Sequence, residues 1–185
     1  MKTALLIIDV QNDYFEGGAH TLVNPMPAAM HAQQVLTAAR LRQLPVVHIQ
    51  HLAINEGADF FLPGTPGADI HPLVEPASGE MLVIKHYPNS FRETTLLEYL
   101  RGENITDLLI CGMMTDVCID ATVRAAMDAG FTTTVIGDAC TTRDRELYGK
   151  PVAAAAVHQA YLAGMAALGG LYAHVITAAE FCGNQ

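Results

Sequence analysis

The chain has 185 residues, 51% of them apolar, and carries ten Lys and Arg against nineteen Asp and Glu, a formal net charge of -9. This length suits one domain with a well-buried core, and we expect a single domain over residues 1–185. The negative charge and the lack of a basic run argue against nucleic acid and against an anionic membrane as partners.

The cysteines and the N-terminus indicate the compartment. Four cysteines are too few and too irregularly spaced for a disulfide framework. They are Cys111, Cys118, Cys140 and Cys182. The first apolar run covers only residues 4–8 before Asp9 interrupts it, which is too short for a signal peptide or a membrane span. These features predict a cytoplasmic protein with reduced thiols.

Six short apolar segments rich in β-branched residues predict strands. They cover residues 4–10, 45–50, 81–85, 107–112, 132–138 and 173–177. Most of them are apolar at every position rather than at alternate positions. This pattern is typical of strands that are covered on both faces.

Helical segments alternate with these strands. We expect helices near residues 27–43, 94–101, 118–129, 151–168 and 178–182. Pro151 suits a first helical position, and Gly169 and Gly170 would end that helix. The alternation predicts right-handed crossovers and a three-layer α/β/α fold around a central six-stranded, mainly parallel sheet.

Three reactive side chains lie where predicted strands end. Asp9 follows the first strand, Lys85 ends the third, and Cys118 comes one short loop after the fourth. Ligands gather at this edge of parallel sheets, so we expect the three residues to share a site. Residues 52–80 are rich in Pro and Gly, and a loop of that length in a compact domain is more often functional than idle.

The position of Cys118 favours nucleophilic chemistry. A helix beginning near Val117 would place this thiol in its first turn, where unpaired N–H groups and the helix dipole stabilise a thiolate or an oxyanion. With Lys85 beside it and Asp9 to take up and return a proton, Cys118 could attack an electrophilic carbon. Each residue alone also has a structural explanation, as a buried thiol, a loop-capping carboxylate or an exposed strand-end lysine.

Four stretches are distinctive as an ordered set. They are LLIIDVQNDYF at 5–15, KHYPNSF at 85–91, CGMMTDVCIDATVRAAMDAGF at 111–131 and GDACTTRD at 137–144. Together they resemble the isochorismatase-like cysteine hydrolases over nearly the whole chain, including the motif G-x-x-T-x-x-C followed by an amphipathic helix. The resemblance implies one isochorismatase-like hydrolase domain with a Rossmann-like fold.

The resemblance also implies roles for individual residues. Asp9 would be the general base and then the general acid, Lys85 would orient its neighbours electrostatically, and Cys118 would form a covalent intermediate. A cis peptide would fall between Met113 and Met114. It would direct the Met114 amide, beside that of Cys118, into an oxyanion hole.

Other positions are pocket candidates by the same resemblance. Tyr14 corresponds to an aromatic residue that lines the substrate pocket, although an aromatic core residue would explain it equally well. Gln11, Phe61 and Thr115 are weaker substrate-binding candidates. His51 could reach the mouth of the pocket as a polar contact.

The histidines do not match the metal-binding branch of the family. Nicotinamidases bind a metal through an Asp-x-His pair and a later His, and the second strand here ends His48-Ile49-Gln50-His51 without that pair. The odd offset places His48 and His51 on opposite faces of a strand, so they cannot chelate one ion together. We therefore expect no metal and no cofactor.

The sequence favours a metal-independent cysteine hydrolase that cleaves a small amide-like C–N bond. One alternative is isochorismatase-type vinyl ether hydrolysis, whose dianionic substrate should be bound by basic residues in the pocket. Another is a non-catalytic thiol redox sensor, which would not need Asp9 and Lys85. The helix near 152–168 is apolar nearly all round and predicts a homo-oligomer, either dimer or tetramer. The sequence does not identify the substrate.

Overall fold

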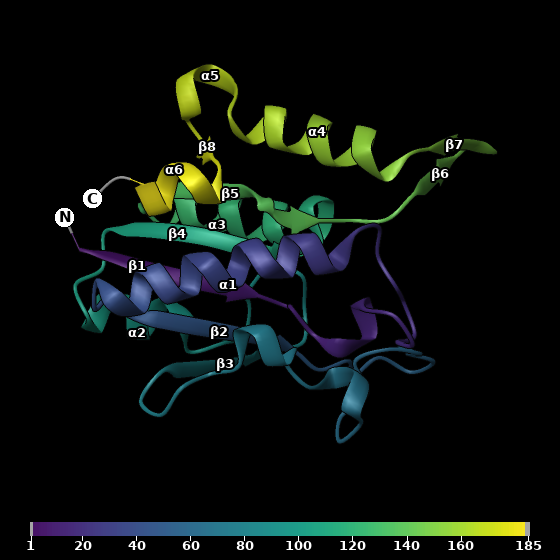
Figure 1. Ribbon diagram of the computed structural model, residues 1–185, viewed down its shortest axis with the longest axis horizontal. Coiled ribbons are helices and arrows are strands. Elements are labelled where there is room, and N and C mark those ends of the chain that lie inside the picture. Colours follow the sequence, from purple (N-terminus) through teal and green to yellow (C-terminus); the bar gives the residue numbers. More distant parts are fainter. Residues whose placement is uncertain (1, 184–185) are drawn as a thin grey trace.

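A six-stranded parallel sheet forms the centre of the computed structural model, which describes residues 2–183 (Figure 1). The strand order is β3-β2-β1-β4-β5-β8, and all five pairings are parallel. The strands are β1 (Thr3–Ile8), β2 (Val46–His51), β3 (Met81–Lys85), β4 (Asp107–Met113), β5 (Thr132–Thr141) and β8 (His174–Ile176). The predicted strands and fold class are confirmed.

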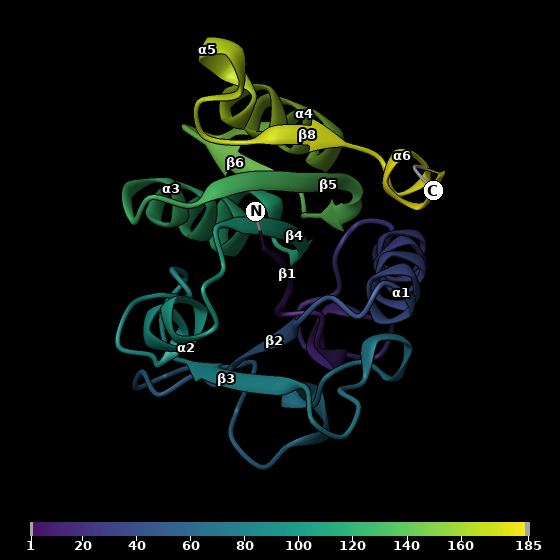
Figure 2. The same cartoon turned by 90° about the vertical axis from the view of Figure 1, so that its left-hand side faces the viewer.

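Helices cover both faces of the sheet (Figure 2). On one face lie α1 (Pro25–Leu41) and α6 (Ala178–Gly183), and on the other lie α2 (Leu96–Gly102) and α3 (Asp120–Asp128). Beside α3, near the β8 edge, lie α4 (Ala154–Met165) and the short α5 (Ala167–Gly170). Because both faces are covered, the central strands are apolar throughout.

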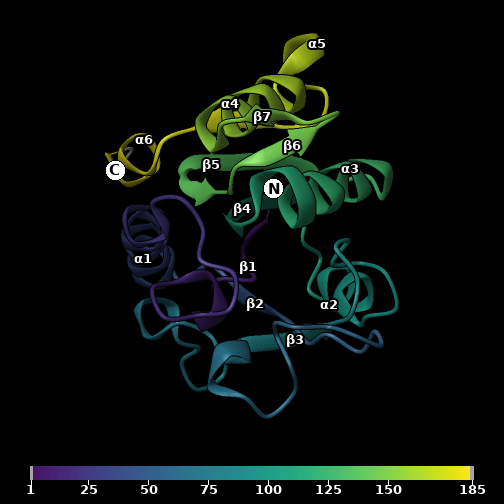
Figure 3. The same ribbon diagram turned by 90° about the vertical axis from the view of Figure 1, so that its right-hand side faces the viewer.

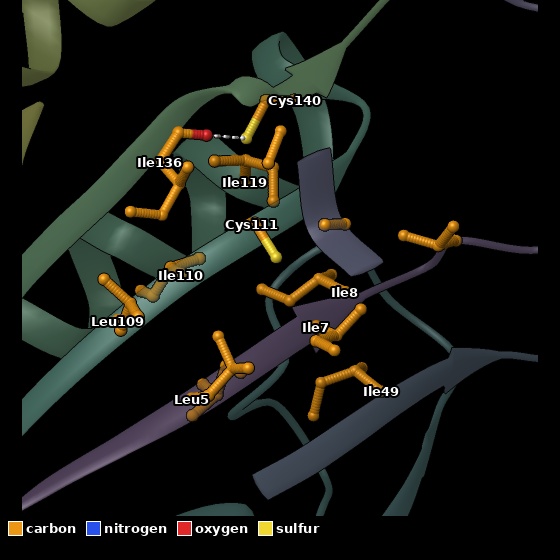
Figure 4. Close-up of a cluster of buried hydrophobic side chains, with 14 of the residues drawn as sticks. Leu5, Ile7, Ile8, Ile49, Leu109, Ile110, Cys111, Ile119, Ile136 and Cys140 are labelled. Carbon is orange, nitrogen blue, oxygen red and sulfur yellow. Dashed lines mark hydrogen bonds between the residues drawn. The ribbon is translucent and has the colours of Figure 1, made fainter. Parts of the chain in front are cut away.

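The core is built from the central strands and the start of α3, as Figure 4 shows. Leu5, Ile7 and Ile8 of β1 pack beside Leu109 and Ile110 of β4, and all are at most 3% exposed. Two cysteines lie in the same core. They are Cys111 and Cys140. Burial raises the pKa of both thiols, so they behave as small apolar side chains.

The predicted helix over 151–168 is wrong at its start. Residues before it form a two-stranded hairpin of β6 (Arg145–Leu147) and β7 (Lys150–Val152), which includes Pro151. Tyr148 and Gly149 both have positive φ, 54° and 71°, as a tight two-residue hairpin turn requires.

The structure also places the end of this helix and the start of the helix after β4 differently. Helix α4 begins at Ala154, whose N–H donates to Asp144 Oδ1 at 2.8 Å, and it ends at Met165. Left-handed residues Leu168 and Gly169 then break the path, so the predicted glycine stop ends α5 instead. The helix predicted to begin near Val117 starts earlier, with a π-helical turn at Thr115–Ile119 that leads into α3.

Within residues 2–183, the structure has no helix with both the length and the apolar character that a bilayer crossing requires.

The homo-oligomer stays a prediction, and the structure adds a surface for it. In Figure 1, α4 lies at the outer edge of the molecule and leads from the β6–β7 hairpin. Leu147, Tyr148, Tyr161 and Leu168 of this region are exposed. We expect light scattering at micromolar concentration to give at least a dimer and Tyr161→Glu to shift it toward monomer. A 19.8 kDa particle for the unaltered chain would contradict the prediction.

A partly buried cluster of charged and polar groups around Glu80 connects α1 to β2 and to the segment before β3. The Glu80 carboxylate accepts hydrogen bonds from Arg40 Nε at 2.7 Å, Arg40 Nη2 at 2.8 Å and the Ala77 N–H at 2.8 Å, and it contacts His48 Nε2 at 2.8 Å. The hydrogen bonds from Arg40 are the main reason that the pKa of Glu80 falls to about 2. His48 thus contacts Glu80, whereas His51 contacts Lys85.

The cluster predicts a pH-dependent contribution to stability. At pH 7, Glu80→Gln should lower the free energy of unfolding by about 1–2 kcal/mol, because charged hydrogen bonds are lost. The folded-state pKa lies below the unfolded value of about 4.3, so the difference should shrink as pH falls below about 5 and vanish near 2. Urea unfolding at several pH values measures this difference. The exposed Glu98→Gln is the control, and a pH-independent difference would contradict the assignment.

Candidate active site

The three side chains predicted at the strand ends meet in the structure. Lys85 Nζ lies 2.7 Å from Asp9 Oδ2 and 3.4 Å from Cys118 Sγ. Asp9 and Lys85 are fully buried, and Cys118 is 3% exposed. The prediction that folding gathers this carboxylate, ammonium and thiol is confirmed.

The sheet order explains how distant segments meet. Asp9 directly follows β1 with φ of 52°, and its N–H donates to Ile49 O in β2 at 3.0 Å. Strand β2 separates β3 from β1, so Lys85 must reach past a neighbouring strand to Asp9. Adjacent strands lie about 4.8 Å apart, a span that the four-carbon lysine stem can cross. Figure 3 looks onto this edge, with the loops after β1 and β2 drawn below α3.

The chain reaches Cys118 through an unusual backbone path. Gly112 near the end of β4 has φ of 132°, and the next peptide bond but one, Met113–Met114, is cis, where the resemblance places it. The π-helical turn at Thr115–Ile119 then presents Cys118. This path fixes the sulfur opposite Asp9 and Lys85.

Gly112 is a position that should not tolerate a side chain. A Cβ there would lie 2.0 Å from Ile8 O in the neighbouring strand, at a φ that L-residues rarely adopt. We expect Gly112→Ala to lower the free energy of unfolding by about 3 kcal/mol. Gly102→Ala, where a Cβ meets nothing within 4 Å, should change it by less than about 0.5 kcal/mol. Equal losses in urea unfolding would contradict this account.

Electrostatics favour a neutral thiol in the resting site. Burial is the largest cause that raises the pKa of Cys118, followed by the charge of Asp9, and these outweigh the opposing charge of Lys85. The expectation of a stabilised thiolate is therefore wrong for the resting protein, because the sulfur is buried beside an anion as well as a cation. The nucleophile needs a base to become reactive.

Asp9 is suited to be that base, and the Lys85 ammonium balances its charge. Burial by itself would lower the pKa of Lys85, but the interactions with Asp9 and Cys118 outweigh it and raise the pKa, so the side chain is an ammonium. Within residues 2–183, neither Asp9 oxygen accepts a well-aligned hydrogen bond. The carboxylate is balanced by the ion pair and is free to accept a proton.

The position of Lys85 bears on whether Asp9, His51 and Cys118 could hold a metal ion. Donor atoms of Asp9, His51 and Cys118 lie within 4.8 Å of one another, a spacing that a cation could bridge. Lys85 Nζ is the cation among them, 2.7 Å from Asp9 Oδ2, 3.0 Å from His51 Nδ1 and 3.4 Å from Cys118 Sγ. A metal ion would have to displace that ammonium, so the donor set does not fit one while Lys85 is charged.

His51 is closer to the chemistry than the sequence indicated. We expected it at most at the pocket mouth, yet its Nδ1 contacts Lys85 Nζ directly. The signal available in the sequence was register, because His51 and Lys85 are paired across β2 and β3. Strand pairing had to be known before that register could be used.

The structure places two of the pocket candidates in an aromatic cluster beside the triad. The cluster lies against His51, whose ring centroid is 5.8 Å from that of Phe61. Tyr14 is 2% exposed, and burial is the largest cause that raises its pKa. Its ring centroid is 4.7 Å from that of the fully buried Phe61. Substrate contact by either residue stays a prediction.

Gln11 and Thr115 already have partners within the protein. Gln11 Nε2 donates to the carbonyl oxygens of His51 at 2.9 Å and Ala68 at 2.7 Å, and its Oε1 accepts from the His51 N–H at 2.8 Å. Thr115 Oγ1 is 2.8 Å from His158 Nδ1 in α4. Gln11 therefore holds the end of β2, and its contact with substrate also stays a prediction, as does that of Thr115.

A cavity of about 370 Å³ opens beside His51. Its wall comes from residues 53–60 of the long loop and from His86, Tyr87 and Pro88 after β3. The loop thus shapes a hollow beside His51, whose Nδ1 contacts Lys85 Nζ at 3.0 Å.

Comparisons with known proteins agree with this fold. The isochorismatase domain model matches residues 3–180. An uncharacterised isochorismatase family protein of Bacillus subtilis is 45% identical over 98% of this chain and 99% of its own length. A streptothricin hydrolase of Streptomyces noursei is 34% identical over 76% of this chain and 50% of its own.

A solved structure from Oleispira antarctica, of the isochorismatase hydrolase type, superimposes with a TM-score of 0.93 at 45% identity. The match covers 99% of this chain and 97% of that one. Fold, strand-end residues and sequence similarity all agree. The chain belongs to the isochorismatase family and is an isochorismatase-family hydrolase.

Proposed function

We propose that this protein is a metal-independent cysteine hydrolase that cleaves a small amide-like C–N bond through a covalent intermediate on Cys118. The observation that carries the proposal is the buried contact of one ammonium with both a carboxylate and a thiol, at 2.7 and 3.4 Å. Asp9, Lys85 and Cys118 would act as one catalytic unit.

In the first step, Cys118 Sγ forms a bond to the amide carbon while Asp9 takes the thiol proton. The carbonyl oxygen becomes an oxyanion, and the amide N–H groups of Met114 and Cys118 would stabilise it. Lys85 pairs with the Asp9 carboxylate before the attack and balances the charge that develops on sulfur.

In the second step, the C–N bond breaks and Asp9, now a carboxylic acid, protonates the leaving nitrogen. This step leaves a thioester on Cys118 and an ionised Asp9. A water molecule then gives its proton to Asp9 as it attacks the thioester carbon. Expulsion of the sulfur and return of the proton restore the thiol and the carboxylate.

Two relatives support the amide class. A streptothricin hydrolase is 34% identical to this chain, and the nicotinamidase of Escherichia coli is 26% identical over 74% of it. The second strand lacks the metal-binding Asp-x-His pair expected of nicotinamidases, and Lys85 Nζ contacts the donor atoms of Asp9, His51 and Cys118. The proposal is therefore an amidase other than a metal-dependent nicotinamidase.

The vinyl ether alternative has little support in the charges near the site. Arg145 Nη2 is 3.4 Å from Met114 Sδ, but its Nε pairs with Asp116 Oδ2 at 2.7 Å. Of the two arginines considered from sequence, Arg124 pairs with Asp120 and Arg92 stacks on Tyr87. A dianionic substrate would find no unpaired arginine among these three.

The sensor alternative conflicts with the state of the thiol. Redox-sensing cysteines are exposed and have a low pKa. Cys118 is 3% exposed, and burial raises its pKa. This environment suits a nucleophile that gives up its proton to Asp9 only as it attacks the substrate.

A panel assay tests the proposal. Primary amides of two to six carbons should release ammonia when incubated with the protein, and isochorismate should release no pyruvate. Cys118→Ala is the matched control for contaminating amidases. Pyruvate release without any amide turnover would overturn the proposal in favour of vinyl ether hydrolysis.

A further inference from the structure

The hydrogen on the His51 ring is fixed by its neighbour. Lys85 Nζ lies 3.0 Å from His51 Nδ1, and an ammonium only donates hydrogen bonds. Nδ1 must therefore be the acceptor, and a neutral ring carries its hydrogen on Nε2. Burial and then the charge of Lys85 lower the pKa of His51 to about 4, so the ring is neutral at pH 7.

A second histidine beside it has the opposite arrangement. His86 Nδ1 lies 2.7 Å from the Leu52 carbonyl oxygen, which only accepts hydrogen bonds. Nδ1 of His86 must therefore carry the hydrogen. In the neutral ring, Nε2 of His86 is then an acceptor, whereas Nε2 of His51 is a donor.

Both rings line the same cavity of about 370 Å³. They are close enough that a charge on His86 would lower the pKa of His51. Within residues 2–183, neither Nε2 has a hydrogen-bond partner in the protein, and both residues are half-buried. The two rings that line the cavity thus carry one unused donor and one unused acceptor, and donor atoms of His51 and Cys118 lie within 4.8 Å of each other.

The cavity has little charge with which to bind an ion. Glu56 is the one Asp, Glu, Lys or Arg among its described lining residues, and it is exposed. A carboxylate substituent would find no counter-ion there, and Asp9 nearby would repel it. An uncharged polar substituent fits this lining better.

His51 and His86 are also held in place before any ligand binds. Gln11 makes two hydrogen bonds to the His51 backbone, at 2.9 and 2.8 Å. The Leu52 N–H donates to Lys85 O at 3.0 Å, which ties the ends of β2 and β3 together. Such preorganisation reduces the entropy lost on binding.

We propose that His51 and His86 form a recognition pair for an uncharged substrate group that presents an acceptor and a donor side by side. A second carboxamide, a ureido group and a lactam are groups of this kind. His51 Nε2–H donates to the carbonyl oxygen of that group, and His86 Nε2 accepts from its N–H. This inference rests on the proposed amidase function, since it names the class of substrate for the same site.

The first test is nitrogen NMR of the wild-type protein with ¹⁵N-labelled histidine rings at pH 8. We expect the Nε2–H tautomer for His51 and the Nδ1–H tautomer for His86. Single His51→Gln and His86→Gln variants assign the signals. The opposite tautomer at either ring would overturn the inference.

The second test titrates the same sample with succinamide and, separately, with butanamide, which has the same chain length but one carboxamide. Succinamide should shift the Nε2 signals of both rings saturably, and butanamide should shift them little. Equal responses, or no response to succinamide, would overturn the inference. Because neither titration needs turnover, shifts without ammonia release would leave the recognition pair standing and refute the proposed amidase function instead.

If succinamide is turned over, specificity gives a kinetic test. The ratio of kcat/KM for succinamide to that for butanamide should fall about 10-fold in His86→Leu, as the loss of one hydrogen bond predicts. His174→Leu, at an exposed position on β8, is the control and should keep the wild-type ratio. An unchanged ratio in His86→Leu would overturn the assignment of that ring.

Discussion

Replacing Cys118 by alanine should lower amide turnover by about 10⁴-fold or more, because removing the nucleophile of a covalent mechanism leaves only binding and oxyanion stabilisation. The substitution removes one buried sulfur from a turn whose backbone bonds stay intact. The fold should therefore survive. Ammonia release under substrate saturation measures the effect.

The control for that experiment is a second buried thiol. Cys140 lies in the core, where its Sγ donates to Ile136 O at 3.3 Å. Cys140→Ala should cost some stability but keep turnover within a few-fold of the wild type. Comparable losses in both variants would mean that Cys118 acts through packing rather than chemistry.

Breaking the Asp9–Lys85 pair should have the largest effect on stability. Asp9→Asn leaves a fully buried ammonium without its counter-charge, and Lys85→Met leaves the carboxylate alone. Each substitution should lower the free energy of unfolding by about 3–5 kcal/mol, as expected for one half of a buried ion pair. Urea unfolding at pH 7 measures both. Turnover should be lost in each variant.

The double variant separates the pair from its surroundings. With both charges absent, Asp9→Asn with Lys85→Met should be destabilised by less than the sum of the two single variants. If the double variant loses as much unfolding free energy as the two single variants together, the two side chains do not depend on each other. That result would contradict the ion pair.

The strands could be predicted because a strand that is buried on both faces has apolar residues at nearly every position. The segments 4–10 and 107–112 are apolar at nearly every position, and they became β1 and β4 at the centre of the sheet. The β6–β7 hairpin escaped prediction. Its strands are three residues each and mostly exposed, so they carry no periodic apolar signal.

The reactive residues could be predicted because parallel strands deliver their ends to one edge. Asp9, Lys85 and Cys118 were each assigned to that edge from their positions alone, and the resemblance supplied their roles. The contacts around them could not be predicted. Gln11 bonds to His51, 40 positions away, and only the paired register of β2 and β3 places His51 against Lys85.

The state of the thiol shows a further limit of sequence reasoning. A cysteine in the first turn beside a lysine predicts a thiolate, and that argument ignores how deeply the sulfur is buried. In the structure, desolvation and the Asp9 carboxylate raise the pKa of Cys118. Burial in the folded protein decides the direction in which the pKa of Cys118 shifts. Because that shift is upward, Asp9 must act as a base.

The most direct measurement of the central claim is intact-protein mass spectrometry after acid quench of a single turnover with an amide substrate. A transient species should appear with the mass of the substrate less ammonia added to the chain, and peptide mapping should place it on Cys118. The species should be missing in Cys118→Ala. Product formation with no adduct at any quench time, or an adduct on a different residue, would contradict covalent catalysis by Cys118.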